Sequence, residues 1–234
     1  MKPLLAIINC HSRPEYQQAI RDIWLPKVPK NLDYRFFLGP SDRTQKGDEV
    51  FLKCRDEYEG LPSKVQAAVR WALDHEYTHI AKCDDDVVLR PDRFMHSGFW
   101  NNDFVGNINT GSRKVDVPWG FFYTLSKKAM ELVAISDLPK NGNDEAWIAD
   151  LLYLQGIQLS RDKRYQLYFG RKELLTETKK RALREVPRPV VKNYLLNPQE
   201  DIAYCVHVDW AGFKEEPHGR NIEEMKRLFG EMTQ

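Results

Sequence analysis

Three adjacent acids, Asp84, Asp85 and Asp86, are the residues of this chain best placed to do chemistry. The apolar run Thr78–Ala81 leads into them and Val87–Leu89 follows, which predicts a buried strand that carries three carboxylates at its tip. Adjacent carboxylates repel one another, and ligand sets made of oxygen alone suit Mg²⁺ or Mn²⁺. In an extended backbone Asp84 and Asp86 project from the same side, so together they can reach one metal ion. The alternative is a solvated acidic turn.

The segments around these acids alternate between strand and helix patterns. Strands are expected over Leu4–Asn9, Tyr34–Gly39, Val50–Cys54, Thr78–Ala81, Asp103–Asn107, the later part of Val117–Ser126, Gly156–Ser160 and Ala203–Val208, and a polar loop over Ser41–Gly47. Helices are expected over Glu15–Trp24, Ser63–His75, a short stretch after Pro91, Lys127–Ile135 and Asp144–Gln155. This order predicts an α/β fold with a mostly parallel sheet flanked by helices. Ligands bind such sheets at the carboxyl ends of the strands, which is where the three acids fall.

Length and composition describe an ordinary globular domain. The chain has 234 residues, of which 42% are hydrophobic and 29% charged, which suits one domain with its own core. No apolar run approaches the roughly 18 residues of a membrane span, and the N-terminus is too short for a signal peptide. Cys10, Cys54, Cys83 and Cys205 fit neither a zinc motif nor a disulfide framework, so we expect reduced core thiols. These features predict a cytoplasmic protein, and none of them indicates an oligomeric state.

The basic segment Arg161–Lys192 concentrates the positive charge of the chain. It holds eleven Lys or Arg against four Asp or Glu, a net charge of +7, so the remainder carries −6 of the total of +1. Aromatic residues are interleaved with these cations, a composition that suits a polyanion such as DNA. The alternatives are a solvated helical face and contact with anionic lipid. The residues expected to contact an anionic acceptor are Arg164, Lys179, Lys180 and Arg181.

Several spaced motifs resemble glycosyltransferase family 31, the β-1,3-galactosyltransferase and N-acetylglucosaminyltransferase family, in that family's order. They are Ala19–Trp24 (AIRDIW), Phe37–Gly39 (FLG), Asp56–Lys64 with Arg70–Trp71, Lys82–Val88 (KCDDDVV), and Asp144–Trp147 with Leu154–Ile157. The resemblance implies a single GT-A domain, a UDP-linked sugar donor, a divalent metal (Mn²⁺ or Mg²⁺) and an inverting reaction. Residues 1–160 would form the nucleotide-sugar and catalytic core, and residues 161–234 the basic acceptor side and C-terminal part.

The resemblance also implies a metal shell. Asp86 would be the principal metal ligand, shared with Asp84, and Asp84 and Asp85 would also contact the donor ribose or the metal through water. GT-A enzymes often add a late histidine, and His207 takes that place here, with His218 as the rival.

Further positions in register with the family would hold the nucleotide and the sugar. Arg21, Asp56 and Lys64 would bind the nucleotide, since a carboxylate can accept from the uracil N–H and cations can meet phosphate. Trp119 and Gly120 fall where the family shapes its sugar pocket, and a tryptophan face stacks well on a sugar.

The general base is assigned by the same register. Glu145 takes the place of the catalytic aspartate, and Asp144 is the alternative. Both acids would also be favoured at a helix N-terminus by the helix dipole. The chain departs from the family at Asn143, Asp144 and Glu145, which replace its acid pair, at Ala149, which replaces a glycine, and in lacking the membrane anchor and stem.

Together these features predict a metal-dependent inverting glycosyltransferase that moves a hexose from a UDP-sugar to an acceptor hydroxyl. The predicted acceptor is DNA carrying hydroxymethylated bases, in a protein of phage or bacterial origin, and the alternative is a glycan or lipid-linked saccharide. Two other classes are a metal-dependent phosphoesterase, which would use the acids, and a nucleic-acid-binding module, which would use the basic segment.

Overall fold

The computed structural model describes residues 1–109, 115–139, 143–168, 201–206 and 219–232. Its strands are β1 Pro3–Ile8, β2 Asp33–Leu38, β3 Gln45–Lys46, β4 Glu49–Phe51, β5 His79–Asp84, β6 Val87–Leu89, β7 Phe104–Asn109, β8 Val117–Ser126, β9 Ser160–Arg161, β10 Tyr165–Tyr168 and β11 Ala203–Val206. Its α-helices are α1 Pro14–Ile23, α2 Leu61–Asp74, α3 Pro91–Met95, α4 Lys127–Ile135, α5 Asp144–Leu154 and α8 Gly219–Met232. Short 3-10 turns lie at η1 Leu25–Lys27, η2 Tyr58–Gly60 and η3 Phe99–Asn101.

Two sheets organise the described residues. The larger has eight strands in the order β3-β4-β2-β1-β5-β8-β7-β9, and the smaller has three in the order β10-β11-β6. Strands β4, β2, β1 and β5 run parallel, as do β7 and β9, whereas β3 and β8 run antiparallel to their neighbours. The predicted α/β class with a mostly parallel sheet is confirmed.

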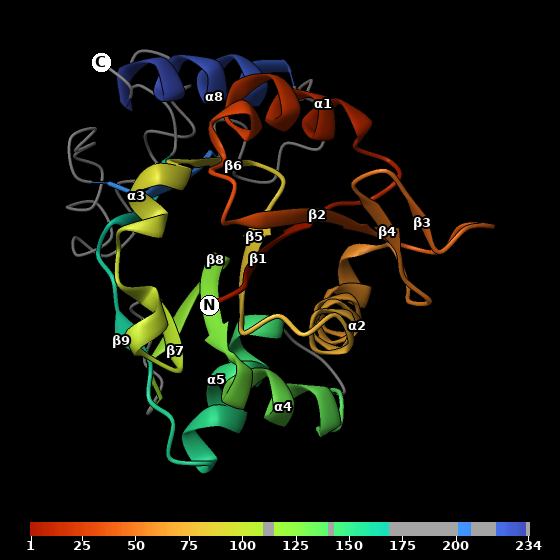
Figure 1. The fold of residues 1–234 in the computed structure, drawn as a ribbon, viewed down its shortest axis with the longest axis vertical. Coiled ribbons are helices and arrows are strands. Elements are labelled where there is room, and N and C mark those ends of the chain that lie inside the picture. The colour runs from red at the N-terminus through yellow and green to blue at the C-terminus, as the bar shows by residue number, and fades with distance from the viewer. Residues whose placement is uncertain (110–114, 140–142, 169–200, 207–218, 233–234) are drawn as a thin grey trace, which may run out of the picture.

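Helices cover both faces of the large sheet, which explains why β1 is apolar along its whole length. Leu5 and Ile7 pack on one side in a cluster with residues of α1 and α8. Leu4 and Ala6 pack on the other side with residues of α2, α4 and α5. Figure 1 shows these two groups of helices on opposite sides of the sheet. A strand buried on both faces has no polar side to alternate with.

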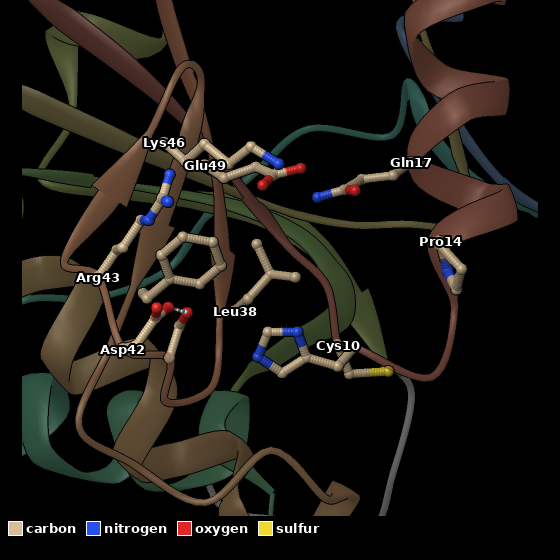
Figure 2. A pocket seen from close by; sticks show the side chains of 11 residues that line it. Cys10, Pro14, Gln17, Leu38, Asp42, Arg43, Lys46 and Glu49 are labelled. Carbon is tan, nitrogen blue, oxygen red and sulfur yellow. Dashed lines mark hydrogen bonds between the residues drawn. The ribbon is translucent and has the colours of Figure 1, made fainter.

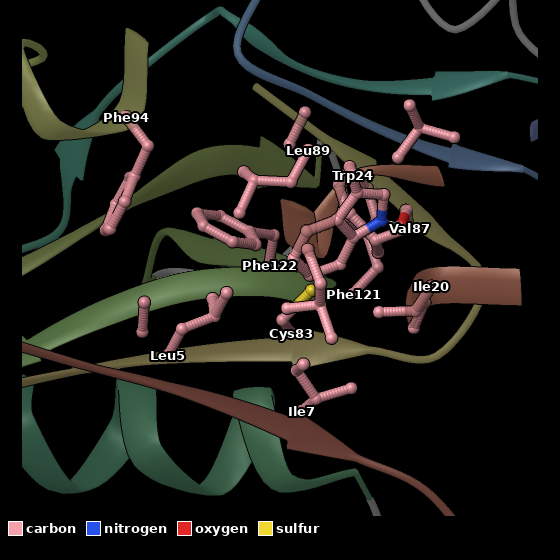
Figure 3. Close-up of a cluster of buried hydrophobic side chains, with 14 of the residues drawn as sticks. Leu5, Ile7, Ile20, Trp24, Cys83, Val87, Leu89, Phe94, Phe121 and Phe122 are labelled. Atoms are coloured by element: carbon pink, nitrogen blue, oxygen red, sulfur yellow. Dashed lines mark hydrogen bonds between the residues drawn. The ribbon is translucent and has the colours of Figure 1, made fainter. Parts of the chain in front are cut away.

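The apolar cluster under α1, which contains Leu5 and Ile7, also holds in place the turn that carries the acids. The Trp24 side chain is fully buried there, and its indole N–H donates a hydrogen bond of 2.9 Å to the Val87 carbonyl. Figure 3 shows the Trp24 indole beside Val87, among Phe121, Phe122 and Cys83. The end of α1 is thereby tied to β6, directly after the acidic turn.

Some predicted boundaries were wrong for local reasons. The expected polar loop over Ser41–Gly47 contains β3, which pairs with β4 through a tight turn at Gly47, whose φ is +61°. The strand expected over Gly156–Ser160 begins only at Ser160. Gly156, with φ +75°, ends α5, and the Ile157 N–H donates to the Leu152 carbonyl at 2.9 Å, so these residues close the helix.

The cysteine prediction holds in part. Cys10, Cys54 and Cys83 are free thiols, but only Cys83 is buried, while Cys10 and Cys54 are partly exposed. The Cys205 side chain lies outside the described part. No helix in the described ranges is long and apolar enough to cross a membrane.

Candidate active site

The three acids lie at the carboxyl edge of the large sheet, as predicted, but their carboxylates take different partners. Strand β5 ends at Asp84, and Asp85 and Asp86 form the turn to β6, so the extended alternation does not continue to Asp86. Asp85 is buried in an ion pair with Arg13, 2.7 Å between Oδ1 and Nη1. The Asn9 amide also donates to Asp85, at 2.8 Å. Burial raises the pKa of Asp85 to about 7 against the opposing charge of Arg13.

Asp84 belongs to a second cluster, centred on Lys82. The Lys82 ammonium lies 2.5 Å from Asp84 Oδ1 and 4.0 Å from Asp144 Oδ2, and it donates to the Gly120 carbonyl. Burial raises the pKa of Asp84, although 30% of its side chain is accessible, and the nearby Asp86 charge raises it further. Lys82 therefore joins β5, β8 and the start of α5 at one point.

The first turn of α5 brings both candidate bases to this cluster. Asp144 is fully buried, and it accepts a hydrogen bond of 2.5 Å from the Tyr123 hydroxyl. Its Oδ1 has no hydrogen-bond partner among the described residues. Glu145, 9% exposed, lies against Gly120, where a Cβ would come within 2.8 Å of Glu145 Oε2, so a larger residue at 120 would displace the carboxylate. Burial, followed by the Asp144 charge, raises the pKa of Glu145 to about 6.

Asp56 and Lys64, which were predicted to bind the nucleotide, form an ion pair that connects two strand ends. The Asp56 carboxylate accepts from the backbone N–H groups of His11 and Gly39, both at 2.7 Å, and from Lys64 at 2.6 Å. These bonds lower the pKa of Asp56 despite its partial burial. Lys64, 3% exposed, also donates to the Asn9 carbonyl at 2.8 Å. The Asp56–Lys64 ion pair thus joins the chain after β1 to the chain after β2. Asn9, whose carbonyl accepts from Lys64, also donates to Asp85 through its side chain.

Arg21 lies apart from the Asp56–Lys64 ion pair. Its guanidinium pairs with Asp48 at 2.7 Å and Glu49 at 3.2 Å, and it covers the Phe36 ring. The structure therefore places Arg21 in a contact between α1 and the β3–β4 hairpin.

A cavity of about 360 Å³ opens between α1 and the β3–β4 hairpin. Figure 2 shows Arg43, Lys46 and Glu49 on the hairpin side and Gln17 on the α1 side. His11 and Phe51 also line the cavity, with parallel rings whose centroids are 5.9 Å apart. No motif in the sequence pointed to this pair, although both residues lie at the carboxyl ends of parallel strands, where ligands are expected.

Tyr58 was also missed. It is 75% exposed on η2, between Asp56 and the start of α2. Partial desolvation is the largest cause that raises the pKa of its phenol, and the charges of Glu145, Asp144 and Asp84 raise it further. An exposed aromatic ring therefore lies near the carboxylates, within the same motif as the predicted nucleotide-binding residues Asp56 and Lys64.

The remaining predicted residues are more scattered. Trp119 is partly buried and packs against the cluster under α1. Arg164 pairs with Asp162 at 2.7 Å and donates to the Ser97 carbonyl at 3.3 Å. Lys179, Lys180, Arg181, His207 and His218 lie outside the described residues. Among the residues that are described, no group of three or more His, Cys, Asp or Glu is arranged to hold a metal ion.

Solved structures with the same architecture cover almost the whole chain. The galactosyltransferase LgtC, in complex with donor and acceptor sugar analogues, matches with a TM-score of 0.50 and 11% identity over 99% of this chain and 96% of that one. A glycosyltransferase involved in the glycosylation of the major capsid of PBCV-1 matches with a TM-score of 0.51 and 10% identity, over 96% of this chain and 100% of that one. The chain has a GT-A fold. At this level of identity the GT-A likeness concerns the fold alone.

Sequence comparison gives a weak and partial match. A "Probable beta-1,3-galactosyltransferase 12" of Arabidopsis thaliana is 32% identical over a stretch that covers 32% of this chain. The match spans 26% of the plant protein, so the matched stretch corresponds to about a quarter of that relative's length. No model of a known protein family matches the chain.

Proposed function

We propose that this chain is a metal-dependent inverting glycosyltransferase of family 31 type, which moves a hexose from a UDP-sugar to an acceptor hydroxyl. The observation that carries the proposal is the position of Glu145. This buried carboxylate, with its pKa raised to about 6, lies beside Gly120, whose carbonyl accepts from Lys82, the ion-pair partner of Asp84 at the carboxyl edge of a GT-A sheet. The name of the plant relative favours galactose as the sugar.

The acidic turn fits a divalent cation in its chemistry. The Asp86 charge raises the pKa of both Asp84 and Asp85 in addition to the effect of burial, because neighbouring carboxylates repel one another, and a bound cation would relieve that repulsion. Asp86 and Asp84 would hold the ion, with His207 as the third protein ligand. A bound Mn²⁺ or Mg²⁺ would supply neutralisation of the leaving diphosphate.

The cavity beside α1 would receive the nucleotide. Its volume of about 360 Å³ suits a small-molecule site, the His11 and Phe51 rings offer stacking surfaces, and Arg43 and Lys46 offer positive charge. Asp56 and Lys64 would shape this site by holding the backbone of His11. The loop after β1 connects cavity and acids, since Asn9 contacts Asp85 while His11 lines the cavity.

Glu145 would act as the general base. The acceptor oxygen attacks the anomeric carbon while the bond from that carbon to the diphosphate oxygen breaks, and the acceptor proton passes to the Glu145 carboxylate. UDP leaves with the bonding electron pair, and attack from the opposite face inverts the configuration. Asp144 is fully buried and bonded to Tyr123, which favours it as a structural partner of the base.

A donor screen tests the proposed function. The chain is incubated with Mn²⁺ and UDP-glucose, UDP-galactose or UDP-N-acetylglucosamine, and released UDP is measured with p-nitrophenyl glycosides, hydroxymethylated DNA or water as acceptor. We expect release from UDP-galactose, abolished by EDTA and restored by Mn²⁺. Release of phosphate from p-nitrophenyl phosphate, with every UDP-sugar left intact, would instead support the phosphoesterase alternative.

The acceptor follows from the charge of the basic segment, most of which lies outside the described residues. We expect transfer of labelled galactose to hydroxymethylated DNA, with DNA binding that weakens steeply with salt, because each neutralised phosphate releases counterions. A base in a duplex would have to be flipped out to reach the carboxylates. Substituting Lys179, Lys180 and Arg181 together by alanine should lower the slope of log K against log salt by about 3.

Unmodified DNA of the same sequence is the control for this acceptor, since it offers the phosphates without the hydroxymethyl group. Transfer to glycosides alone, with DNA binding that does not respond to salt, would contradict the DNA assignment and leave a glycan or lipid-linked saccharide as the acceptor.

A further inference from the structure

We propose that Lys82 is a positioning residue for the general base Glu145, an inference that rests on the proposed function. No substrate needs to touch Lys82 for this role. It holds the two pieces of backbone between which the Glu145 carboxylate lies.

The ammonium of Lys82 is surrounded by oxygens from three elements. Asp84 Oδ1, at the end of its own strand β5, lies at 2.5 Å, the Gly120 carbonyl of β8 accepts a hydrogen bond, and Asp144 Oδ2 of α5 lies at 4.0 Å. Asp84 and Gly120 can take two of its three donors, and Asp144 lies at ion-pair distance. A lysine engaged in this way joins the sheet edge to the helix that begins beside it.

Two of these three oxygens belong to the immediate surroundings of Glu145. Asp144 precedes Glu145 in the first turn of α5, and the backbone of Gly120 lies so close that a Cβ there would be 2.8 Å from Glu145 Oε2. The Tyr123 hydroxyl, at 2.5 Å, holds Asp144 from the side of β8 as well. Lys82 therefore fixes both neighbours of the carboxylate and ties them to Asp84, on the donor side.

The burial of Lys82 separates this role from direct substrate binding. Its side chain is 3% exposed, and its ammonium lies 5.7 Å from the centre of the Tyr123 ring. The lysine can therefore act only through its neighbours. Since displacement of a catalytic group by about 1 Å can cost about 10²-fold in rate, loss of this anchor should affect turnover more than binding.

The experiment is Lys82→Met, which keeps the length of the side chain as far as the ε carbon and removes the ammonium. We expect kcat for UDP release from UDP-galactose in Mn²⁺ to fall by about 10²-fold, while the calorimetric Kd for UDP in Mn²⁺ stays at the wild-type value. Arg93→Met is the matched control, because Arg93 donates to the Asp201 carbonyl, outside the acid cluster. A Lys82→Met protein with wild-type kcat, or with kcat lost only in proportion to UDP affinity, overturns the proposal.

A double-mutant cycle then tests whether Lys82 acts through Glu145. Groups that act as one unit are non-additive, so adding Lys82→Met to Glu145→Gln should cost little further kcat. Full additivity of the two losses would show that Lys82 acts elsewhere and would overturn the assignment. A Glu145→Gln protein with wild-type kcat would contradict the proposed function itself, so the two failures are distinguishable.

Tyr123→Phe provides the test if circular dichroism shows that Lys82→Met does not fold. It removes the bond to Asp144 and leaves the ammonium in place. We expect a smaller fall in kcat with unchanged UDP affinity, and no further fall in the Glu145→Gln background. An unchanged kcat for Tyr123→Phe would overturn the proposal.

Discussion

Replacing Asp86 by alanine is expected to abolish sugar transfer and to weaken UDP binding in Mn²⁺. Asp86 lies in the turn between β5 and β6, which the bond from Trp24 to the Val87 carbonyl holds in place. Its charge adds to those of Asp84 and Asp85, and a metal bound to the turn would neutralise the diphosphate as it leaves. Turnover is measured as UDP release and affinity by calorimetry, each with Mn²⁺ and with EDTA.

The control for this variant is Asp92→Ala. Asp92 is an acid on α3 with an exposed side chain, and its ion pair is with Arg90. It should change neither turnover nor the Mn²⁺ dependence of UDP binding. Wild-type turnover in Asp86→Ala would remove Asp86 from the metal site.

Glu145→Gln should lower turnover by about 10²- to 10⁴-fold, the usual contribution of a general base, while UDP binding is retained. Glutamine preserves the shape that packs against Gly120 but cannot take a proton. The pH dependence is a second readout. Because the pKa of Glu145 is raised to about 6, wild-type kcat should fall as the pH drops through that value and the carboxylate protonates. The glutamine variant should lack this acidic limb.

Asp144→Asn is the comparison that decides between the two acids of α5. If Asp144→Asn is slow and loses the acidic limb while Glu145→Gln behaves as wild type, the base is Asp144. We expect the reverse, because Asp144 is fully buried and already accepts a hydrogen bond from the Tyr123 hydroxyl.

The periodicity of the chain predicted most of the architecture. The double-sided apolar character of β1, the helical spacing of α1 and α2, and the acids after β5 are local features, and each element lies close to its predicted range. The wrong boundaries fall where a single glycine redirects the chain, as at Gly156, because a residue with positive φ ends a helix. The resemblance of spaced motifs also pointed to the GT-A fold that the solved structures share.

The long-range contacts of the charged side chains were decided by the tertiary structure. Asp84 and Asp85 are neighbours in sequence, yet one pairs with Lys82 and the other with Arg13. The parallel register of β1 and β5 places Ile8 beside Asp84, and so brings Asn9 to Asp85 across 76 residues.

The same holds for the predicted nucleotide and base residues. Asp56 and Lys64 bind each other, and Arg21 turns to the β3–β4 hairpin. The burial of Asp144 and the position of Glu145 against Gly120 result from the packing of α5 on β8. The sequence alone determined which residue types stand at the strand ends, because side-chain periodicity is a local property. Only the tertiary structure decided their long-range partners, because strand order and register bring together residues that are far apart in the chain.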